Sequence, residues 1–451
     1  MNYQEARIFI DELGTGGIMP GLDRIRNLLD YFDHPEKNMH VIHVAGTNGK
    51  GSVCAFIAMA LEEAGYRTGR YISPGISDYC DRIQVNRAWI SESDVAWLMT
   101  RIRHAIEESS VDDGAQMPSA FEAETVMAFL YFKEQKCDFV VLECGMGGLE
   151  DATNVIDHPL ISVITPIGMD HTQYLGGDIA SITKHKGGII KEGRPVVIGA
   201  KEPEAVEILK KIGREKHAKA VITDFDAVRI REVSSREGIK FDYGEYHELR
   251  TQMPAVYQTE NAAIAIDALK QLKQLPDQDF DLPYYLVPKE MITDSVIYKG
   301  ISQVMRPGRF ERIEGRPTVI IDGAHNPHGA SAAVQAIKQL NTDKKIVLLM
   351  AVFKDKDYDR MLEILASVSQ TIVTYAPEGP RGLSAQVLAD HAQKYFSDVS
   401  FAGSQREAYA MACKQASAEG LILACGSLST VASLKDLLQY ENVQEESYES
   451  H

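Results

Sequence analysis

The sequence predicts an α/β protein of two domains, each built on a mainly parallel sheet covered by helices. Short apolar runs typical of buried strands alternate along the chain with longer helix-like stretches, which is the pattern of parallel strands joined by crossover helices. The alternation occurs in two series, with a segment of different character between them. A chain of 451 residues is long enough to bury more than one hydrophobic core.

The first series predicts the larger domain. Its strand-like runs are 40–45 (HVIHVA), 138–144 (DFVVLEC), 160–165 (LISVIT) and 194–199 (RPVVIG). After residue 224 the chain reads VRIREVSSREGIKFDYG. The alternation of apolar and polar residues there, together with Gly238, predicts a small antiparallel hairpin.

The second series predicts the smaller domain. Its strand-like runs are 317–325 (PTVIIDGAH), 345–353 (KIVLLMAVF), 370–376 (QTIVTYA) and 420–426 (GLILACG). Between the two series, Gly and Pro interrupt the periodicity at 298–309 (YKGISQVMRPGR), as expected at a domain boundary. We therefore place the domains at 1–298 and 306–440, and we expect the acidic tail QEESYESH to be disordered.

Composition and charge exclude several classes of function. The formal net charge of -17, without any Lys/Arg-rich block, argues against binding of nucleic acid. No apolar run approaches the roughly 18 residues of a membrane span, and the start MNYQEARIFIDELG does not resemble a signal peptide, so we expect a cytoplasmic protein. The six cysteines show no C-x-x-C spacing, which favours buried reduced thiols over disulfides or zinc ligands.

A glycine-rich loop follows the first strand-like run. The stretch 43–53, HVAGTNGKGSV, lies between that run and a segment of helical periodicity. Glycines let the backbone approach an anion closely, and the first amides of the following helix point their hydrogens at it. Lys50 would lie across the terminal phosphates, and the Ser52 hydroxyl could ligate magnesium. The stretch therefore predicts a phosphate-binding loop, with a turn needed only for packing as the alternative.

The spelling of this loop departs from the common G-x-x-x-x-G-K-[ST], because Gly51 separates Lys50 from Ser52. Read with further motifs in their order along the chain, it resembles the folylpolyglutamate synthase/dihydrofolate synthase family, within the Mur ligase superfamily. The resemblance runs from about residue 18 to residue 435. The motifs are SPG (73–75), LECGMGG (142–148), DATN (151–154), GMDHTQYLG (168–176), KHKGGIIK (184–191), RPGRFE (306–311), DGAHNP (322–327) and GSLSTV (426–431).

This resemblance implies both a fold and an activity. The fold is an N-terminal P-loop ATPase-like domain with a mainly parallel sheet, plus a smaller C-terminal Rossmann-like α/β domain. The activity is ATP-dependent addition of L-glutamate to folate, to dihydropteroate, or to both, with Mg²⁺ and by a monomeric enzyme. The acceptor carboxylate attacks the γ-phosphate of ATP to form an acyl phosphate, which the amino group of glutamate then attacks.

The resemblance also assigns the ATP-binding residues. Gln258 and Asn261 would pair with the adenine edge, although helix capping is an alternative for Gln258. Arg309 could reach phosphates, and a structural salt bridge is its alternative. The complete expected set is Thr47, Asn48, Gly49, Lys50, Gly51, Ser52, Gln258, Asn261, Arg309, Asp322 and His325.

The expected magnesium ligands are Ser52, Ser73, Glu143 and His171. Glu143 ends the buried run FVVLE, where a carboxylate beside a phosphate loop is needed, although a capping or solvated glutamate is the alternative. Lys186 is similar to the family lysine that carries a carbamate, with a surface lysine as the alternative. The resemblance thus makes Lys50, Glu143, His171 and Lys186 the expected catalytic residues.

For the acceptor, the stretches 17–25 (GIMPGLDRI) and 121–129 (FEAETVMAF) resemble the parts of the family that contact the pteridine. Phe121, Glu122 and Asp151 are the candidate substrate-binding residues. Phe121 could stack on a flat heterocycle, and a core aromatic is the alternative.

Three positions depart from the family pattern. Leu149 stands where the family usually has Arg in G-x-G-G-R-x-D-x-T-N, and Gly75 stands where many members have His or Tyr after S-P. Met305 and Arg306 replace the aromatic residue before P-G-R. These departures concern the acceptor preference.

Other classes of protein fit the sequence less well. A peptidoglycan-precursor ligase usually has Thr or Ser directly after the loop lysine and an extra N-terminal domain. A nucleotide-binding regulator or inactive paralogue is motivated by Leu149 and Gly75. A P-loop motor or transporter ATPase fits the short loop variant poorly.

Overall fold

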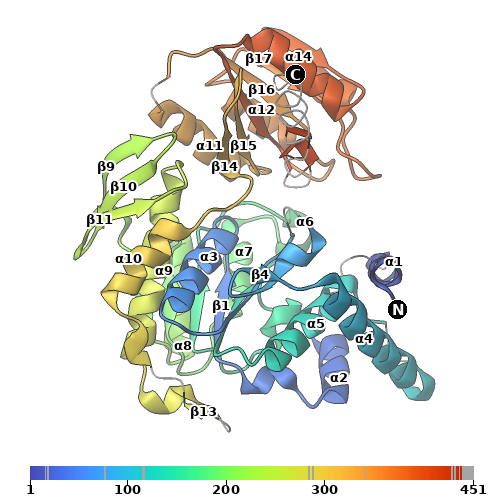
Figure 1. The fold of residues 1–451 in the computed structure, drawn as a ribbon, viewed down its shortest axis with the longest axis vertical. Coiled ribbons are helices and arrows are strands. Elements are labelled where there is room, and N and C mark those ends of the chain that lie inside the picture. Colours follow the sequence, from blue (N-terminus) through green and yellow to red (C-terminus); the bar gives the residue numbers. More distant parts are fainter. Residues whose placement is uncertain are drawn as a thin grey trace, which may run out of the picture. The chain divides into compact units, whose positions relative to one another are not determined.

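The computed structural model describes residues 1–15, 17, 20–75, 78–113, 117–282, 285–286, 289–340, 342–427, 430, 433–435 and 437–438. Within this part, the chain forms two compact units (Figure 1). Unit 1 comprises Met1–Val228 and Glu260–Val304, and unit 2 comprises Arg229–Thr259 and Met305–His451. The expected acidic tail lies outside the described residues, as do parts of the motifs at 17–25 and 426–431.

Unit 1 is built on an eight-stranded sheet with the order β4-β3-β2-β5-β1-β6-β7-β8. From β2 to β8 along this order the pairs are parallel, while β3 and β4 add an antiparallel edge. Every residue of β1, β5 and β6 is buried, as expected of strands covered on both faces. The strands are β1 Val41–Ala45, β2 Thr68–Tyr71, β3 Ile83–Val85, β4 Ala88–Trp89, β5 Phe139–Glu143, β6 Ile161–Ile164, β7 Val196–Ile198 and β8 Ala220–Ile222.

Helices cover this sheet. Helices α3 and α10 lie side by side (Figure 1), and they approach so closely that a Cβ on Gly300 would lie 2.6 Å from the Cβ of Ala60. The α-helices are α1 Tyr3–Gly14, α2 Asp23–Tyr31, α3 Lys50–Glu63, α4 Glu92–Asp113, α5 Ala120–Glu134, α6 Thr172–Leu175, α7 Ile179–Gly187, α8 Pro203–Glu215, α9 Tyr257–Gln274 and α10 Asp294–Gln303. Short 3-10 helices are η1 Pro35–Asn38, η2 Tyr79–Arg82, η3 Ala152–Val155, η4 Phe225–Ala227, η5 Asp277–Phe280 and η6 Lys289–Met291, and β12 Asp281–Leu282 pairs with β13 Tyr285–Leu286.

Unit 2 contains a six-stranded sheet with the order β14-β15-β19-β16-β17-β18, in which only the edge strand β14 is antiparallel to its neighbour. Two apolar clusters form its core, one with side chains from α11, α12 and α13 and the other with side chains from α14. Helices therefore cover both faces. The elements are β14 Arg309–Ile313, β15 Thr318–Asp322, α11 Pro327–Gln339, β16 Ile346–Met350, α12 Tyr358–Leu365, β17 Thr371–Thr374, α13 Ala385–Ala392, β18 Asp398–Phe401, α14 Gln405–Ala416 and β19 Leu421–Cys425.

The predicted α/β fold class is confirmed. The hairpin expected after residue 224 is present with a third strand, as β9 Val228–Ser234, β10 Gly238–Tyr243 and β11 Tyr246–Thr251 form a small sheet. The structure differs from the expected division of the chain, because Arg229–Thr259 groups with the second unit. The reason is packing: Ala255 belongs to the same buried cluster as Phe310 and Ile320.

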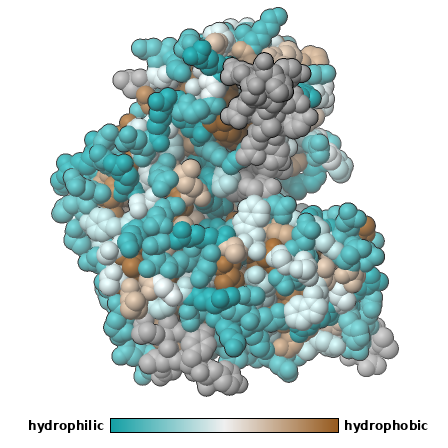
Figure 2. Space-filling view, viewed as in Figure 1, coloured by the Kyte–Doolittle hydropathy of each residue, from teal (hydrophilic) through white to brown (hydrophobic). Residues whose placement is uncertain are grey.

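Apolar residues that remain on the visible face occur as scattered patches among hydrophilic ones (Figure 2). Across the described residues, no helix has both the length and the apolar character needed to cross a bilayer. All six cysteines are free thiols, and five of them are buried.

Candidate active site

The glycine-rich loop joins β1 to α3 and requires glycine at two positions. Gly46 has φ 151° and Gly49 has φ 87°, a region that side chains other than glycine rarely adopt. A Cβ on Gly46 would lie 1.8 Å from Thr165 Oγ1, and a Cβ on Gly49 would lie 2.3 Å from Asn261 Oδ1. The loop therefore packs where no larger residue would fit.

Hydrogen bonds to the end of β6 hold this loop in place. The Thr47 amide donates to Pro166 O at 3.0 Å, and the Thr47 hydroxyl donates to Gly168 O at 3.0 Å. The Thr165 hydroxyl donates to Asn48 O at 2.7 Å. Helix α3 begins directly after Gly49, and because glycine has no side chain, the helix has no side-chain cap. The first amides of a helix bind anions well, so this end of α3 is a ready phosphate site.

Lys50 and Glu143 come together beside the loop. The Lys50 Nζ lies 3.3 Å from Thr47 O and 3.9 Å from Glu143 Oε1. Glu143 is buried at the end of β5, the strand next to β1. Ser52 is buried in the first turn of α3. The structure thus places a cation, a carboxylate and a hydroxyl of the expected site on adjacent elements of unit 1.

Lys186 also reaches the loop, although 140 residues separate it from Gly46. Its buried Nζ donates to Gly46 O at 2.8 Å. Burial, together with the positive charge of Lys50, lowers the pKa of Lys186 to about 7. Because Lys186 is buried, the alternative of a surface lysine is wrong. With this lowered pKa, a substantial fraction of the amine is uncharged near neutral pH.

The structure provides one strong observation for the expected magnesium site. The Ser73 Oγ is buried and has no hydrogen-bond partner among the described residues, as would suit a group that awaits a ligand. Ser73 follows β2, which pairs with β5, so Ser73 and Glu143 leave the sheet at the same edge. His171, at φ 51° before α6, is half-exposed, and its Nε2 lies 3.9 Å from Asp170 Oδ2. No three His, Cys, Asp or Glu side chains form a metal-binding group in the described part of the chain.

Asp151 is part of a buried hydrogen-bond network. Its carboxylate accepts the Met146 amide at 2.7 Å and the Thr153 hydroxyl at 2.6 Å. Thr153 Oγ1 in turn lies 2.8 Å from His43 Nε2, and burial lowers the pKa of His43 to about 3, so the imidazole is neutral. The same Nε2 lies 3.1 Å from Cys144 Sγ, so Thr153 and Cys144 are both partners of this nitrogen. Sequence reasoning missed His43, because a single histidine in an apolar strand has no distinctive signal.

The candidate acceptor residues have structural partners. The Phe121 ring is stacked on Tyr71 at 6.0 Å and 21°, and a Cβ on Gly145 would lie 2.6 Å from Phe121 Cζ. Glu122 forms a capping box with Ser119 at the start of α5 and an ion pair with Arg24 at 3.2 Å. These contacts give Phe121 and Glu122 structural roles. Their role in acceptor binding stays a prediction.

The departures from the family pattern have different surroundings. Leu149 is 50% exposed and donates its amide to His185 O at 2.7 Å. A Cβ on Gly75 would lie 2.4 Å from Asp81 Oδ1 and 2.7 Å from the backbone oxygen of Asp78, so a larger residue would crowd the backbone there. Met305 is exposed, whereas Arg306 is buried.

The adenine candidates lie in the first turns of α9. Asn261 is buried and lies against Gly49 of the loop in unit 1. Gln258 is fully buried and lies in the segment that groups with unit 2. Its backbone N–H donates to Ala255 O at 2.9 Å.

A buried carboxylate of unit 2 is surrounded by hydrogen-bond donors and a cation. Asp322, at the end of β15, accepts the Tyr257 hydroxyl at 2.7 Å and the Ala324 amide at 2.9 Å. Burial raises the pKa of Asp322, while the Tyr257 hydrogen bond and the charge of Arg309 act in the opposite direction. The nearby His325 Nδ1 lies 2.9 Å from Gly323 O. Sequence reasoning missed Tyr257, which directly precedes the expected Gln258.

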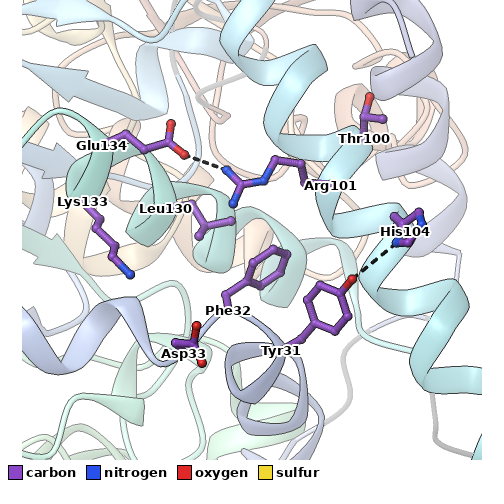
Figure 3. A pocket seen from close by; sticks show the side chains of 9 residues that line it. All are labelled: Tyr31, Phe32, Asp33, Thr100, Arg101, His104, Leu130, Lys133 and Glu134. Carbon is purple, nitrogen blue, oxygen red and sulfur yellow. Dashed lines mark hydrogen bonds and ion pairs between the residues drawn. The ribbon is translucent and has the colours of Figure 1, made fainter.

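A cavity of about 560 Å³ lies elsewhere in unit 1 (Figure 3). It is lined by residues at the ends of α2 and α5 and in the middle of α4. Helices α2 and α5 precede β1 and β5, so the cavity lies toward the amino ends of these strands, whereas the glycine-rich loop follows the carboxyl end of β1. Within the cavity Arg101 pairs with Glu134 at 2.7 Å, and the Tyr31 hydroxyl lies 3.4 Å from His104 Nδ1 (Figure 3). This cavity contains none of the expected site residues.

Comparisons with known proteins agree with the motifs. The Mur ligase middle domain matches residues 44–269, and the Mur ligase glutamate ligase domain matches residues 308–428. A dihydrofolate synthase/folylpolyglutamate synthase of Bacillus subtilis (strain 168) is 34% identical over 446 residues, covering 97% of this chain and 99% of the relative.

Solved structures give the same result. A Mycobacterium tuberculosis folylpolyglutamate synthase complexed with ADP has a TM-score of 0.85 and 30% identity, covering 96% of this chain and 98% of the other. A bifunctional folylpolyglutamate synthase/dihydrofolate synthase with Mn, AMPPNP and L-glutamate bound has a TM-score of 0.81 and 28% identity, covering 97% and 98%. The family predicted from the motifs is confirmed: over nearly its whole length, the chain belongs to the dihydrofolate synthase/folylpolyglutamate synthase family of ATP-dependent Mur ligases.

Proposed function

We propose that this ligase adds L-glutamate to the carboxylate of folate and of dihydropteroate, through an acyl phosphate. The observation that carries the proposal is the grouping of Lys50, Glu143 and Lys186 around the loop at Gly46. Lys186 is only 3% exposed, so its amine is held at the loop despite the cost of removing it from water. The relative solved with Mn, AMPPNP and L-glutamate supports the same substrates for this chain.

Lys50 and the start of α3 hold the phosphates of ATP in this proposal. The Lys50 Nζ is kept beside the loop by Thr47 O, and the uncapped amides of α3 face the same anion. As the acceptor carboxylate attacks the γ-phosphorus, the bond to the β,γ-bridging oxygen breaks and negative charge grows on the transferring group. Lys50 stabilises that charge, which is where a fixed cation accelerates phosphoryl transfer most.

Ser52, Ser73, Glu143 and His171 are the proposed magnesium ligands. The orphaned Ser73 hydroxyl and the buried Glu143 carboxylate fit a hard cation that prefers oxygen. When bound, magnesium would neutralise phosphate charge and polarise the γ-phosphate. The protein holds Glu143 ready for this role because β5 places it one strand from the loop.

Lys186 is proposed to react with CO₂. Its neutral amine forms a bond to the carbon of CO₂ and releases one proton, which gives a carbamate and changes the side chain from a cation into an anion. Burial favours this step because it lowers the pKa of Lys186 to about 7 and so supplies the unprotonated nucleophile. The resulting anion would support a divalent metal instead of repelling it.

The remaining assignments are also proposals. Asn261 and Gln258 bind the adenine, and Arg309, Asp322 and His325 bind ATP from unit 2. Asp151, Phe121 and Glu122 contribute to the acceptor site. A cytoplasmic location and a monomeric state stay predictions, as do the domain limits 1–298 and 306–440 apart from Arg229–Thr259, which groups with the second unit.

Phosphate release measures the proposed function directly. The protein would be assayed with ATP, Mg²⁺ and L-glutamate, with either dihydropteroate or tetrahydrofolate as acceptor, and the products would be weighed by mass spectrometry. We expect release with both acceptors, each product heavier by one glutamyl unit, and background release from a Lys50→Ala control. ATP binding without glutamate-dependent release would contradict the proposal and favour an inactive paralogue.

A further inference from the structure

The hydroxyl of Tyr257 occupies an unusual place in unit 2. Tyr257 is the first residue of α9 and packs against the apolar cluster beneath β14 and β15. Its O–H donates to Asp322 Oδ2 at 2.7 Å, while the other carboxylate oxygen, Oδ1, accepts the Ala324 amide at 2.9 Å. Each oxygen of Asp322 thus has a neutral donor from the protein.

Arg309 lies on the strand beside Asp322. The two residues are register partners in the antiparallel pair of β14 and β15, and the charge of Arg309 acts on both Asp322 and Tyr257. Yet the Arg309 Nε is buried and has no hydrogen-bond partner among the described residues. A guanidinium beside a carboxylate ordinarily forms a two-point pair with it, so the unused Nε needs an explanation.

The backbone between these residues contributes to this arrangement. A bulge lies between Arg309 and Glu311, and the intervening Phe310 has φ 55° although it is fully buried. A bulky residue in this region is rare, and bulges commonly redirect a neighbouring side chain. The chain therefore keeps a strained backbone next to Arg309 instead of relaxing into a regular ladder.

We propose that Tyr257 is a positioning residue for ATP: its hydroxyl holds Asp322 in the orientation that leaves the Arg309 Nε–H edge available for a phosphate. Without that hydroxyl, the carboxylate is free to rotate toward Arg309 and form a closed two-point pair. The closed pair neutralises the guanidinium and uses the donors that an incoming phosphate needs. This inference rests on the proposed role of Arg309 and Asp322 in ATP binding.

Tyr257→Phe tests the inference, because it removes a single oxygen and keeps the ring in the apolar cluster. The measurements are the Kd of ATP by calorimetry, together with kcat and the KM values for ATP and glutamate. We expect the Kd and KM for ATP to rise about tenfold, the scale of one hydrogen bond to a charged group. At saturating ATP, kcat and the KM for glutamate should change less than about twofold.

A matched control and a double variant separate positioning from stability. Tyr375→Phe removes another buried hydroxyl of unit 2, which accepts a hydrogen bond from Gln405 Nε2 at 2.9 Å, and should leave the KM for ATP unchanged. In an Asp322→Asn background, the effect of Tyr257→Phe should disappear, since the amide cannot form the closed ion pair. A merely structural role would lower the melting temperature and leave the ratio of the KM for ATP to the KM for glutamate unchanged.

The outcomes distinguish this inference from the function on which it rests. If Arg309→Ala and Asp322→Asn both leave ATP binding unchanged, the assignment of these residues to the ATP site is wrong. If they weaken it while Tyr257→Phe stays within twofold of the parent, or if Tyr257→Phe has the same effect in both backgrounds, the positioning role is wrong.

Discussion

The loops after β1 and β15 begin alike and end differently. Each leaves the carboxyl end of a fully buried strand and leads into a helix, the arrangement that places ligands at the edge of an open sheet. After β1, Gly49 precedes helix α3 and no side chain caps that helix. After β15, Asn326 precedes helix α11 and caps it, since its Oδ1 accepts the Gly329 amide at 2.7 Å.

The difference shows how one strand-loop-helix pattern serves two purposes. An uncapped, glycine-rich start leaves the helix amides for an anion, whereas a capped start satisfies them within the protein. Hydrogen bonds from and to the residues after β6 hold the loop of unit 1, and its shape suits a phosphate. In unit 2 the proposed ATP-binding groups are side chains, and the Tyr257 hydroxyl donates to Asp322. We therefore expect changes at the first loop to affect the chemical step and changes near Asp322 to affect mainly ATP affinity.

The largest expected effect is at Lys50. Lys50→Ala should lower kcat by about 10²–10³-fold, because it removes the fixed cation from the transferring phosphate. Lys210→Ala, on the exposed side of α8, is the matched control and should keep nearly full activity. Steady-state phosphate release measures both. If Lys50→Ala only raised the KM for ATP and left kcat unchanged, the expectation that the first loop affects the chemical step would be wrong.

Lys186 should have the next largest effect. Lys186→Ala should lower activity by about 10–100-fold, the usual cost of losing a group that supports a metal site. In buffer with limiting bicarbonate, activity of the parent enzyme should rise as pH increases through about 7, because the uncharged amine predominates above that pKa. ¹³C NMR after incubation with labelled bicarbonate should show a carbamate signal that the variant lacks. An identical spectrum from the variant would contradict the modification.

Thr153 tests the buried network that supports unit 1. Thr153→Val keeps the shape of the side chain but leaves Asp151 and His43 without their shared hydroxyl. The free energy of unfolding should fall by about 1–3 kcal/mol in urea titrations. Ser397→Ala removes an exposed hydroxyl of unit 2 and should cost less than about 0.5 kcal/mol. Equal stability of Thr153→Val and the parent would show that the network does not hold the loop after β5.

Leu149 should have the smallest effect. Leu149→Arg restores the basic residue of the family pattern at a half-exposed position, so stability should change by less than about 0.5 kcal/mol. The KM for the acceptor should fall a few-fold if this position faces the anionic substrate, and the KM for ATP should stay constant. An effect on ATP alone would place Leu149 on the nucleotide side of the site.

Much of the fold could be predicted because its causes are local or periodic. The apolar runs predicted β1, β5, β6 and β7, and the glycines with Lys50 predicted the phosphate-binding loop. Strands β2 and β3 were missed because polar residues interrupt them, and β4 and β8 were missed because they are short edge strands with exposed residues. The family motifs supplied most of the candidate site residues, but not their contacts.

The sequence by itself determined the two α/β series, the glycine-rich loop between a strand and a helix, and the family, because these depend on residue order within short windows. Only the tertiary structure decided that Lys186 donates to Gly46 across 140 residues, that Thr153 joins His43 to Asp151, and that Tyr257 holds Asp322. It also decided that Arg229–Thr259 packs with the second unit. Hydrogen bonds and burial between distant segments have no period in the sequence, so they exist only once the chain has folded.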